Sequence, residues 1–210
     1  MKKAIAITIK PQHLVNILDG TKLGEIRKNK VLINAIKREI AKKGKATIYC
    51  ICSKKEWYLI RDNRCDDYYI CHKNRLCEMD ITDTILNGKV VCKFECKKVE
   101  EIYSDENGMS YYTDTITEDY KVSELARVGD GDIEEYLNGD IGYFIYISNL
   151  KVFKNSKKLT DLKIKSFEKV KVLGSPYGDL DSVAYHYEKK LIYKPLTKAP
   201  QNFCYVEDTL

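Results

Sequence analysis

The chain has 210 residues and a formal net charge of +5, from 36 Lys and Arg against 31 Asp and Glu. With 44% hydrophobic and 32% charged residues, its composition is that of a folded globular protein and excludes an intrinsically disordered chain. No apolar run approaches the ~20 residues that a membrane-spanning helix needs, so we expect no membrane partner.

Positive charge is concentrated in residues 1 to 55, whereas residues 100 to 140 are acidic. The small surplus permits a polyanionic partner without requiring one. The N-terminal sequence MKKAIAITIKPQ has too short an apolar stretch for a secretory signal, so it predicts a first strand and a cytoplasmic protein. In that compartment the eight cysteines are expected to be free thiols or metal ligands rather than disulfides.

The first part of the chain predicts short strands and helices in alternation. We expect a strand over residues 3 to 9, a helix that begins at Pro11 and is closed by Gly20, and a strand over residues 22 to 28. The sequence VLINAIKREIAKK predicts a helix that ends at Gly44 with lysines in its last turn. ATIYCICS is the next predicted strand.

The rest of the chain is richer in strands and turns. Residues 54 to 87 have weak periodicity and predict hairpins and loops, which end at a turn that launches the strand KVVCKFECKKVEEIY. An acidic helical stretch follows, and IGYFIYISNLKVF, residues 141 to 153, is the most apolar strand and is expected to be central. Residues 163 to 190 predict a hairpin around GSPYGD, and the tail YKPLTKAPQNFCYVE is expected to lie extended across the surface.

Several short strands with a few flanking helices, and no βαβ rhythm, predict an α+β fold built on a mostly antiparallel β-barrel or curled sheet. We expect one domain over residues 1 to 210, with insertions at about 54–87 and 163–190. Such barrels commonly hold a ligand at the mouth or in a groove beside it.

The cysteines favour a structural role. Cys50 and Cys52 lie two apart, and Cys92 and Cys96 four apart, in predicted strands, so each pair shares one face of its strand and should face the core. A zinc site would draw on the spacing C-x5-C-H-x4-C, which lacks the C-x2-C knuckle of structural sites. We therefore predict no metal and no cofactor. The weak metal candidates are Cys65, Cys71, His72 and Cys77.

The segment GTKLGEIRK, residues 20 to 28, is the strongest functional candidate. If it is a strand, Lys22 points to one side while Glu25 and Arg27 share the other and can pair. Arg27 would still offer a planar fork to a phosphate or a base edge, and Lys22 a point charge. The alternative is a solvated edge strand whose charges prevent aggregation.

Four segments together resemble the ASCH family of PUA-like domains, in particular the branch from phages and prophages of low-GC bacteria. They are AITIKPQHLVNILDGTKLGEIRK, NGKVVCKFECKKVEEI, GYFIYISNLKVF and YKPLTKAPQNFCYVE, and the most diagnostic element is G-x-K-x-x-x-I-R. The resemblance implies a PUA-like β-barrel with a cleft that binds RNA or a nucleotide. The residues expected to bind are Lys10, Lys22, Glu25, Arg27 and Lys28, assisted by Tyr193, Lys198, Gln201 and Asn202.

Two alternatives stay open. One branch of the family is an amidohydrolase of acetylated cytidine, similar through G-x-K-T-x-T-x-R; Lys22 matches its lysine, and Glu134 or Glu135 stands near its later glutamate. Its threonine is Glu25 here, and an ionised carboxylate would repel an oxyanion, so Lys22 and Glu25 are catalytic candidates only if the protein is an enzyme. The other alternative is a phage factor that binds a host protein through acidic residues 100 to 140.

Overall fold

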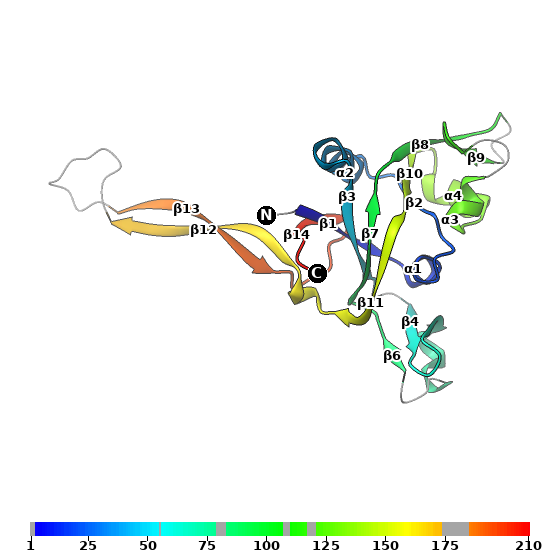
Figure 1. The fold of residues 1–210 in the computed structure, drawn as a ribbon, viewed down its shortest axis with the longest axis horizontal. Coiled ribbons are helices and arrows are strands. Elements are labelled where there is room, and N and C mark those ends of the chain that lie inside the picture. Colours follow the sequence, from blue (N-terminus) through cyan, green and yellow to red (C-terminus); the bar gives the residue numbers. More distant parts are fainter. Residues whose placement is uncertain (1–2, 55, 79–82, 107–109, 117–120, 174–184) are drawn as a thin grey trace.

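The computed structural model describes residues 3–54, 56–78, 83–106, 110–116, 121–173 and 185–210. These residues form a mixed α+β fold of three β-sheets, with helices in the connections between their strands (Figure 1). Among the helices in these ranges, none is long and apolar enough to cross a membrane.

The largest sheet has seven strands in the order β11-β7-β3-β1-β14-β12-β13. The β1 and β3 strands run parallel and the other neighbours run antiparallel. The bounds of its strands are β1 (Lys3–Ile9), β3 (Ala46–Cys52), β7 (Val90–Cys96), β11 (Ser148–Lys157), β12 (Lys163–Leu173), β13 (Tyr185–Pro195) and β14 (Phe203–Glu207).

Two smaller sheets are antiparallel throughout. The four-stranded sheet has the order β2-β10-β8-β9, and the three-stranded sheet has the order β5-β4-β6. Their strands are β2 (Gly24–Arg27), β8 (Val99–Ser104), β9 (Tyr111–Tyr112), β10 (Gly142–Tyr146), β4 (Trp57–Asp62), β5 (Asp67–His72) and β6 (Thr84–Ile85).

The first two helices begin and end where the sequence predicts. Helix α1 (Pro11–Leu18) has Pro11 in its first turn, where the missing N–H costs nothing. Helix α2 (Lys30–Lys43) is capped by Asn29, whose side chain accepts a hydrogen bond from Leu32 N, and ends at Gly44 with φ of 73°. The other helical elements are α3 (Val122–Ala126), α4 (Asp130–Leu137) and the 3-10 turns η1 (Lys73–Glu78) and η2 (Leu159–Asp161).

Both faces of β1 are buried, so this strand lies at the centre of the core. Ile5 and Ile7 pack in one cluster with Leu14 of α1. Ala6 points the other way, into a second cluster that contains Tyr49. Each fully buried Ile or Leu contributes about 1.5–3 kcal/mol of transfer free energy, and this core fixes the position of the loop that follows β1.

The mostly antiparallel α+β prediction is confirmed, but the structure does not describe a closed barrel. In the described residues the seven-stranded sheet is open, with β11 at one end and β13 at the other. The reason is that β13 belongs to a long hairpin with β12 that extends away from the body, so its outer edge does not return to β11 (Figure 1).

Three strand predictions are wrong. The segment KVVCKFECKKVEEIY is not one strand, because it splits into β7 of the seven-stranded sheet and β8 of the four-stranded sheet. Residues 141 to 153 are not one strand, because Ile147 N donates to Leu23 O at 2.9 Å and the chain passes there from the four-stranded to the seven-stranded sheet. Only β10 is central, while β11 is an end strand. The tail does not lie wholly across the surface, because β14 pairs with β1 from Lys3 and Glu207 to Ile7 and Phe203.

The two segments predicted to be insertions each form a sheet element of their own. Residues 54 to 87 contain the three-stranded sheet, in which β4 and β5 contact α1. The β12–β13 hairpin pairs along its whole described length, from Lys163 and Pro195 to Leu173 and Tyr185. The predicted turn GSPYGD lies in residues 174–184, outside the described residues.

Candidate functional site

A cleft of about 490 Å³ opens between two walls. One wall is formed by the end of β1, the start of α1 and β2, and the other by α4 and the turn before it. The residues that line it are Thr8, Lys10, Gln12, His13, Lys22, Glu25, Ile26, Arg27, Val128, Asp132, Ile133, Glu135 and Tyr136.

The backbone of residues 20 to 24 determines how the first wall is built. Gly20, with φ of 72°, ends α1, and Lys22 N donates to Asn16 O at 2.9 Å, which folds the chain back along the helix. At Gly24 a Cβ atom would lie 1.9 Å from Cζ of Phe144. Only glycine therefore lets β2 approach β10 closely enough to bring Glu25 to the cleft.

Lys22 and Glu25 meet, although strand alternation predicts that they point to opposite sides. That prediction is wrong because β2 begins at Gly24, so Lys22 lies in the turn before the strand, where alternation does not apply. Nζ of Lys22 lies 3.2 Å from Oε2 of Glu25, and the two residues are only 2% and 4% exposed.

Arg27 completes this buried ionic cluster. Its Nη2 lies 2.9 Å from Oε1 of Glu25, which confirms the predicted pairing, and it also donates to Thr8 O at 2.9 Å. One carboxylate thus faces two cations. A buried charge without such compensation would be strongly destabilising.

The cluster shifts the pKa of its acidic and imidazole groups. Burial alone would raise the pKa of Glu25, but Lys22, Arg27 and His13 outweigh it and lower the pKa, so the carboxylate is ionised. The pKa of His13 is lowered, first by burial and then by Lys22, and Glu25 only partly opposes this. The imidazole is therefore neutral near pH 7.

Two buried polar atoms of the cluster have no hydrogen-bond partner among the residues that the structure describes. They are Oε2 of Glu25, which has only the ion-pair approach of Lys22, and Nε of Arg27. Leaving such a group unpaired costs about 1–3 kcal/mol. Because both residues line the cleft, a ligand there could make these hydrogen bonds.

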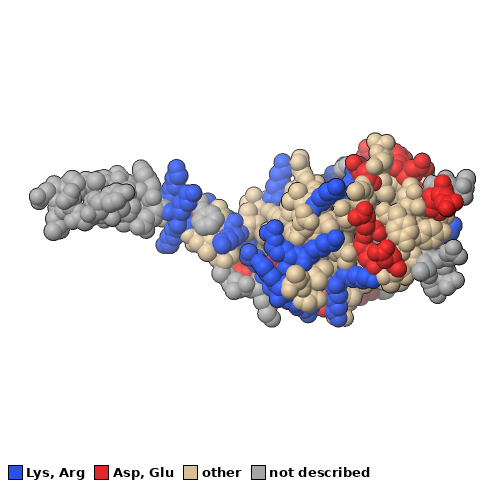
Figure 2. Space-filling view, turned by 90° about the horizontal axis from the view of Figure 1, so that it is seen from above, with Lys and Arg blue, Asp and Glu red and all other residues tan. Residues whose placement is uncertain are grey.

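The second wall has the opposite charge. Asp132 and Glu135 of α4 line it together with Tyr136, whose side chain is exposed. Figure 2 shows acidic side chains gathered at the end of the molecule away from the β12–β13 hairpin. Lys28 lies beside the cleft rather than in its lining, with Nζ 5.5 Å from the Tyr136 ring centre and 2.9 Å from Asp140 Oδ2.

The sequence-predicted binding residues separate into two groups. Lys10, Lys22, Glu25 and Arg27 come together in the cleft. Tail residues do not contribute to the lining, although Pro200 O accepts a hydrogen bond from Thr8 Oγ1 at 2.7 Å and brings the tail next to it. The tail residues concerned are Tyr193 in β13 and Lys198, Gln201 and Asn202 in the link to β14.

Several lining residues were missed by sequence reasoning. His13 follows Pro11 by two residues in the first turn of α1, and this position could have placed it beside Lys10. Asp132 and Tyr136 carried no signal, because α4 is placed by contacts distant in sequence: its Ile133 lies in one buried cluster with Ile26 of β2.

The predicted core cysteines are confirmed, since Cys50, Cys52, Cys92 and Cys96 are buried free thiols. Burial raises the pKa of Cys52 to about 12. For the zinc candidates, Cys65 is exposed, and the Cys71 thiol lies against the carbonyls of His72 and Arg75. The Cys77 side chain lies outside the described residues. In the rest of the described chain, no group of three or more His, Cys, Asp or Glu is placed to hold a metal ion.

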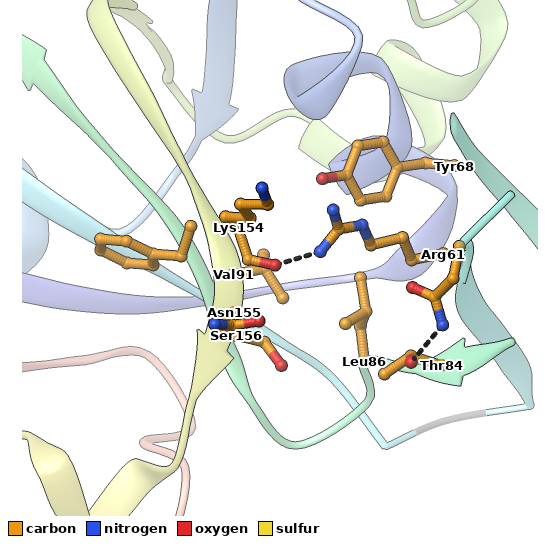
Figure 3. A pocket seen from close by; sticks show the side chains of 10 residues that line it. Arg61, Tyr68, Thr84, Leu86, Val91, Lys154, Asn155 and Ser156 are labelled. Carbon is orange, nitrogen blue, oxygen red and sulfur yellow. Dashed lines mark hydrogen bonds between the residues drawn. The ribbon is translucent and has the colours of Figure 1, made fainter. Parts of the chain in front are cut away.

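A second cavity, of about 240 Å³, lies between the three-stranded sheet and β7 and β11 (Figure 3). Arg61 points into it, but its guanidinium already donates to Lys154 O and pairs with Asp66. Asn63 is likewise bonded to Thr84. These polar groups hold the three-stranded sheet against β11, so we do not assign a ligand to this cavity.

The comparisons with known proteins give little guidance. No protein-family model matches the sequence, and no curated protein matches it. Among solved structures, the chain is similar to the N-terminal domain of Staphylothermus marinus McrB, with 13% identity and a TM-score of 0.40 over 77% of this chain and 82% of that chain. A likeness of this size decides neither the fold family nor the function.

Proposed function

We propose that the protein is a PUA-like domain of the ASCH type whose cleft binds RNA or a nucleotide. The observation that carries the proposal is the convergence of Lys10, Lys22 and Arg27 in one cleft. Charged donors of this kind make strong, short hydrogen bonds to phosphate oxygens. The volume of about 490 Å³ falls within the range of small-molecule sites, about 300–1,000 Å³.

The opposite charge of the two walls favours a nucleotide over an inorganic anion. Asp132 and Glu135 would repel a bare phosphate, but their carboxylates accept hydrogen bonds from exocyclic amino groups such as N4 of cytosine. Tyr136 lies on the same wall and is available for stacking, which contributes about 1–3 kcal/mol per base. A ligand with its phosphate on the β1–β2 wall and its base on α4 fits both walls.

The geometry favours binding over hydrolysis. The lowered pKa of Glu25 makes this carboxylate a poor general acid and a weak base. Both carboxylate oxygens face cations, Lys22 and Arg27, and no hydroxyl stands at the threonine position of the hydrolytic relatives. A host-protein partner has less support, because the acidic stretch already supplies Asp132 and Glu135 to the cleft wall.

The test is a calorimetric titration of the protein with cytidine and adenosine monophosphates and with the matching nucleosides. Lys10→Ala should weaken binding of the monophosphates by about ten- to a hundredfold and leave the nucleosides little changed, because one charge-assisted hydrogen bond contributes about 1.5–3 kcal/mol. Lys10 is suited to this test because it is exposed and lies outside the buried cluster.

Lys42→Ala is the matched control, since it removes one exposed lysine from the last turn of α2. An equal effect of both variants, or no nucleotide binding by the wild-type protein, would refute the proposal. A single-turnover assay with N4-acetylcytidine covers the alternative activity. Cleavage that Lys22→Ala abolishes would show an amidohydrolase instead.

A further inference from the structure

The β12–β13 hairpin is a two-stranded ribbon that projects from the body (Figure 1). Its base is anchored where Ile164 pairs with Val206 of β14 and joins the second core cluster. Each strand has 11 residues, which at about 3.3 Å per residue gives a length of about 36 Å. This is close to one turn of a nucleic-acid duplex, about 34–36 Å.

The register assigns the side chains of the ribbon to two faces, because directly opposed residues in an antiparallel pair point the same way. Lys169 is opposed by Lys189, and Lys165 is opposed by Tyr193. We call this side the lysine face. Its described basic residues are Lys163, Lys165, Lys169 and Lys189.

The other face of the ribbon differs in composition. Ile164, Val170 and Ile192 point to this side and are half-buried, and Glu168 is directly opposed by Lys190. On this face Glu168 therefore opposes one of the two described lysines, Lys190, and Lys194 is the other. Among the described side chains of the lysine face, none is acidic.

The Lys169 and Lys189 pair is unfavourable in the isolated protein. Directly opposed side chains have Cβ atoms about 4.5–5.5 Å apart, and like charges at that separation destabilise a sheet. Both lysines are exposed, and the four lysines lie along about 20 Å of ribbon between Lys163 and Lys169. The repulsion between Lys169 and Lys189 is relieved when a polyanion covers this face.

We propose that the lysine face binds the phosphate backbone of a double-stranded nucleic acid. This site goes beyond the cleft, because it would contact phosphates along a duplex, whereas the cleft would hold one nucleotide. A two-stranded ribbon fits the major groove of B-form DNA, about 12 Å wide, but not the deep, narrow major groove of A-form RNA. Figure 2 shows Lys and Arg side chains on the described part of the hairpin and on the adjoining body.

Tyr193 supports the assignment. It stands between lysines on the same face, opposite Lys165, and its partly exposed ring and hydroxyl can contact a sugar or a phosphate. Leu191, next on this face, is 41% exposed. An aromatic and an aliphatic group among lysines give a duplex apolar contact as well as charge.

The test uses the full chain and two double variants that remove the same charge. Lys169→Gln with Lys189→Gln alters the lysine face, and Lys190→Gln with Lys194→Gln alters the opposite face of the same ribbon. Binding to a 20-base-pair DNA duplex and to an RNA duplex is measured by fluorescence anisotropy at several salt concentrations. For DNA, the lysine-face variant should lower the slope of log affinity against log salt by about two, because each phosphate contact contributes about 0.9.

The control variant should keep the slope of the wild-type protein. An equal fall in both double variants would overturn the proposal, because it would show an effect of net charge rather than of one face. The proposal would also be overturned if the wild-type protein bound neither duplex. A larger effect on DNA than on RNA supports entry into the major groove, and equal effects support backbone contact alone.

The experiment distinguishes failure of the proposed nucleotide binding in the cleft from failure of the proposed duplex binding by the ribbon. Mononucleotides are too small to reach both sites, so their binding reports on the cleft and should be the same in both ribbon variants. Urea unfolding of the lysine-face variant should show unchanged or slightly higher stability, because the like-charge pair is gone. This result would separate a loss of binding from a loss of folding.

Discussion

Two of the buried glutamates among the described residues, Glu25 and Glu100, are neutralised in different ways. Glu100 in β8 is 9% exposed, and its oxygens accept from Thr113 Oγ1 at 2.7 Å, Thr115 Oγ1 at 2.5 Å and the Tyr146 hydroxyl at 2.5 Å. Glu25 is 4% exposed and faces the two cations Lys22 and Arg27.

The surroundings of Glu100 and of Glu25 both favour the ionised carboxylate, but only those of Glu25 leave polar atoms without a hydrogen-bond partner among the described residues. Burial would raise the pKa of Glu100, yet hydrogen bonds from Lys98 and three hydroxyls lower it to about 2. Fully satisfied networks of this kind make a local structure rigid. At Glu25 an oxygen and a neighbouring Arg27 nitrogen remain without hydrogen-bond partners at the edge of a cleft. Glu100 therefore acts as a structural brace, whereas the unused bonding capacity at Glu25 supports the proposed binding site.

The largest expected effect comes from removal of each carboxylate. Glu25→Ala should lower the free energy of unfolding by about 3–5 kcal/mol, because Lys22, only 2% exposed, would keep a buried charge without its partner. Glu100→Ala should cost less, about 2–3 kcal/mol, because the Lys98 side chain is 47% exposed and can be hydrated. Urea unfolding followed by circular dichroism measures both values.

A paired substitution controls for the loss of volume. Lys22→Met with Glu25→Leu replaces the ion pair by apolar groups, and such replacements of buried pairs are often neutral. Most of the stability should then return, while nucleotide binding should remain lost. A cost of Glu25→Ala no larger than that of Glu100→Ala would show that loss of the Glu25 carboxylate leaves no uncompensated buried charge on Lys22.

A smaller effect is expected at the structural brace. Tyr146→Phe removes one hydrogen bond to Glu100 and should cost about 1 kcal/mol at pH 7. The stability that depends on a lowered pKa is present above the ordinary value of 4.5 and is lost as the pH falls towards about 2. The variant raises the pKa of Glu100 in the folded state. The difference in the free energy of unfolding between the variant and the wild type should therefore become smaller as the pH falls from 5 to about 2.

Tyr103→Phe is the matched control for that pH dependence. The Tyr103 hydroxyl donates to the backbone oxygen of Thr113 at 2.9 Å, not to a carboxylate. Its removal should lower stability by an amount that stays constant with pH. A Tyr146→Phe penalty that is likewise constant would show that Glu100 does not depend on this hydroxyl for its lowered pKa.

The parts of the Glu25 and Glu100 surroundings that depend on contacts between sequence neighbours were predictable from the sequence. Pro11, Asn29 and Gly44 act on their own neighbours, so the bounds of α1 and α2 were predictable. The Glu25 and Arg27 pair was also predictable, since alternation holds inside a strand. Lys22 was misplaced by a difference of two residues in where β2 begins.

The rest of both sites depends on contacts between distant segments. Glu100 is joined to Tyr146 through the pairing of β8 with β10, and neither sequence segment carries a sign of the other. The acidic wall of the cleft depends on where α4 packs, and the split of residues 141 to 153 depends on one bond from Ile147 to Leu23. Periodicity within a segment contains no information about such partners.

The smallest expected effect is a change in the pKa of His13 when a monophosphate binds in the cleft. An anion in the cleft would offset Lys10, Lys22 and Arg27, so the lowered pKa of His13 should rise when a monophosphate binds. Binding then takes up a proton, and affinity should increase a few-fold as the pH falls through the His13 titration. Imidazole NMR signals with and without ligand measure the shift, and His72, which packs on Trp57 outside the cleft, should not respond. Equal shifts at both histidines, or none at His13, would mean that the phosphate does not bind beside the Glu25 cluster.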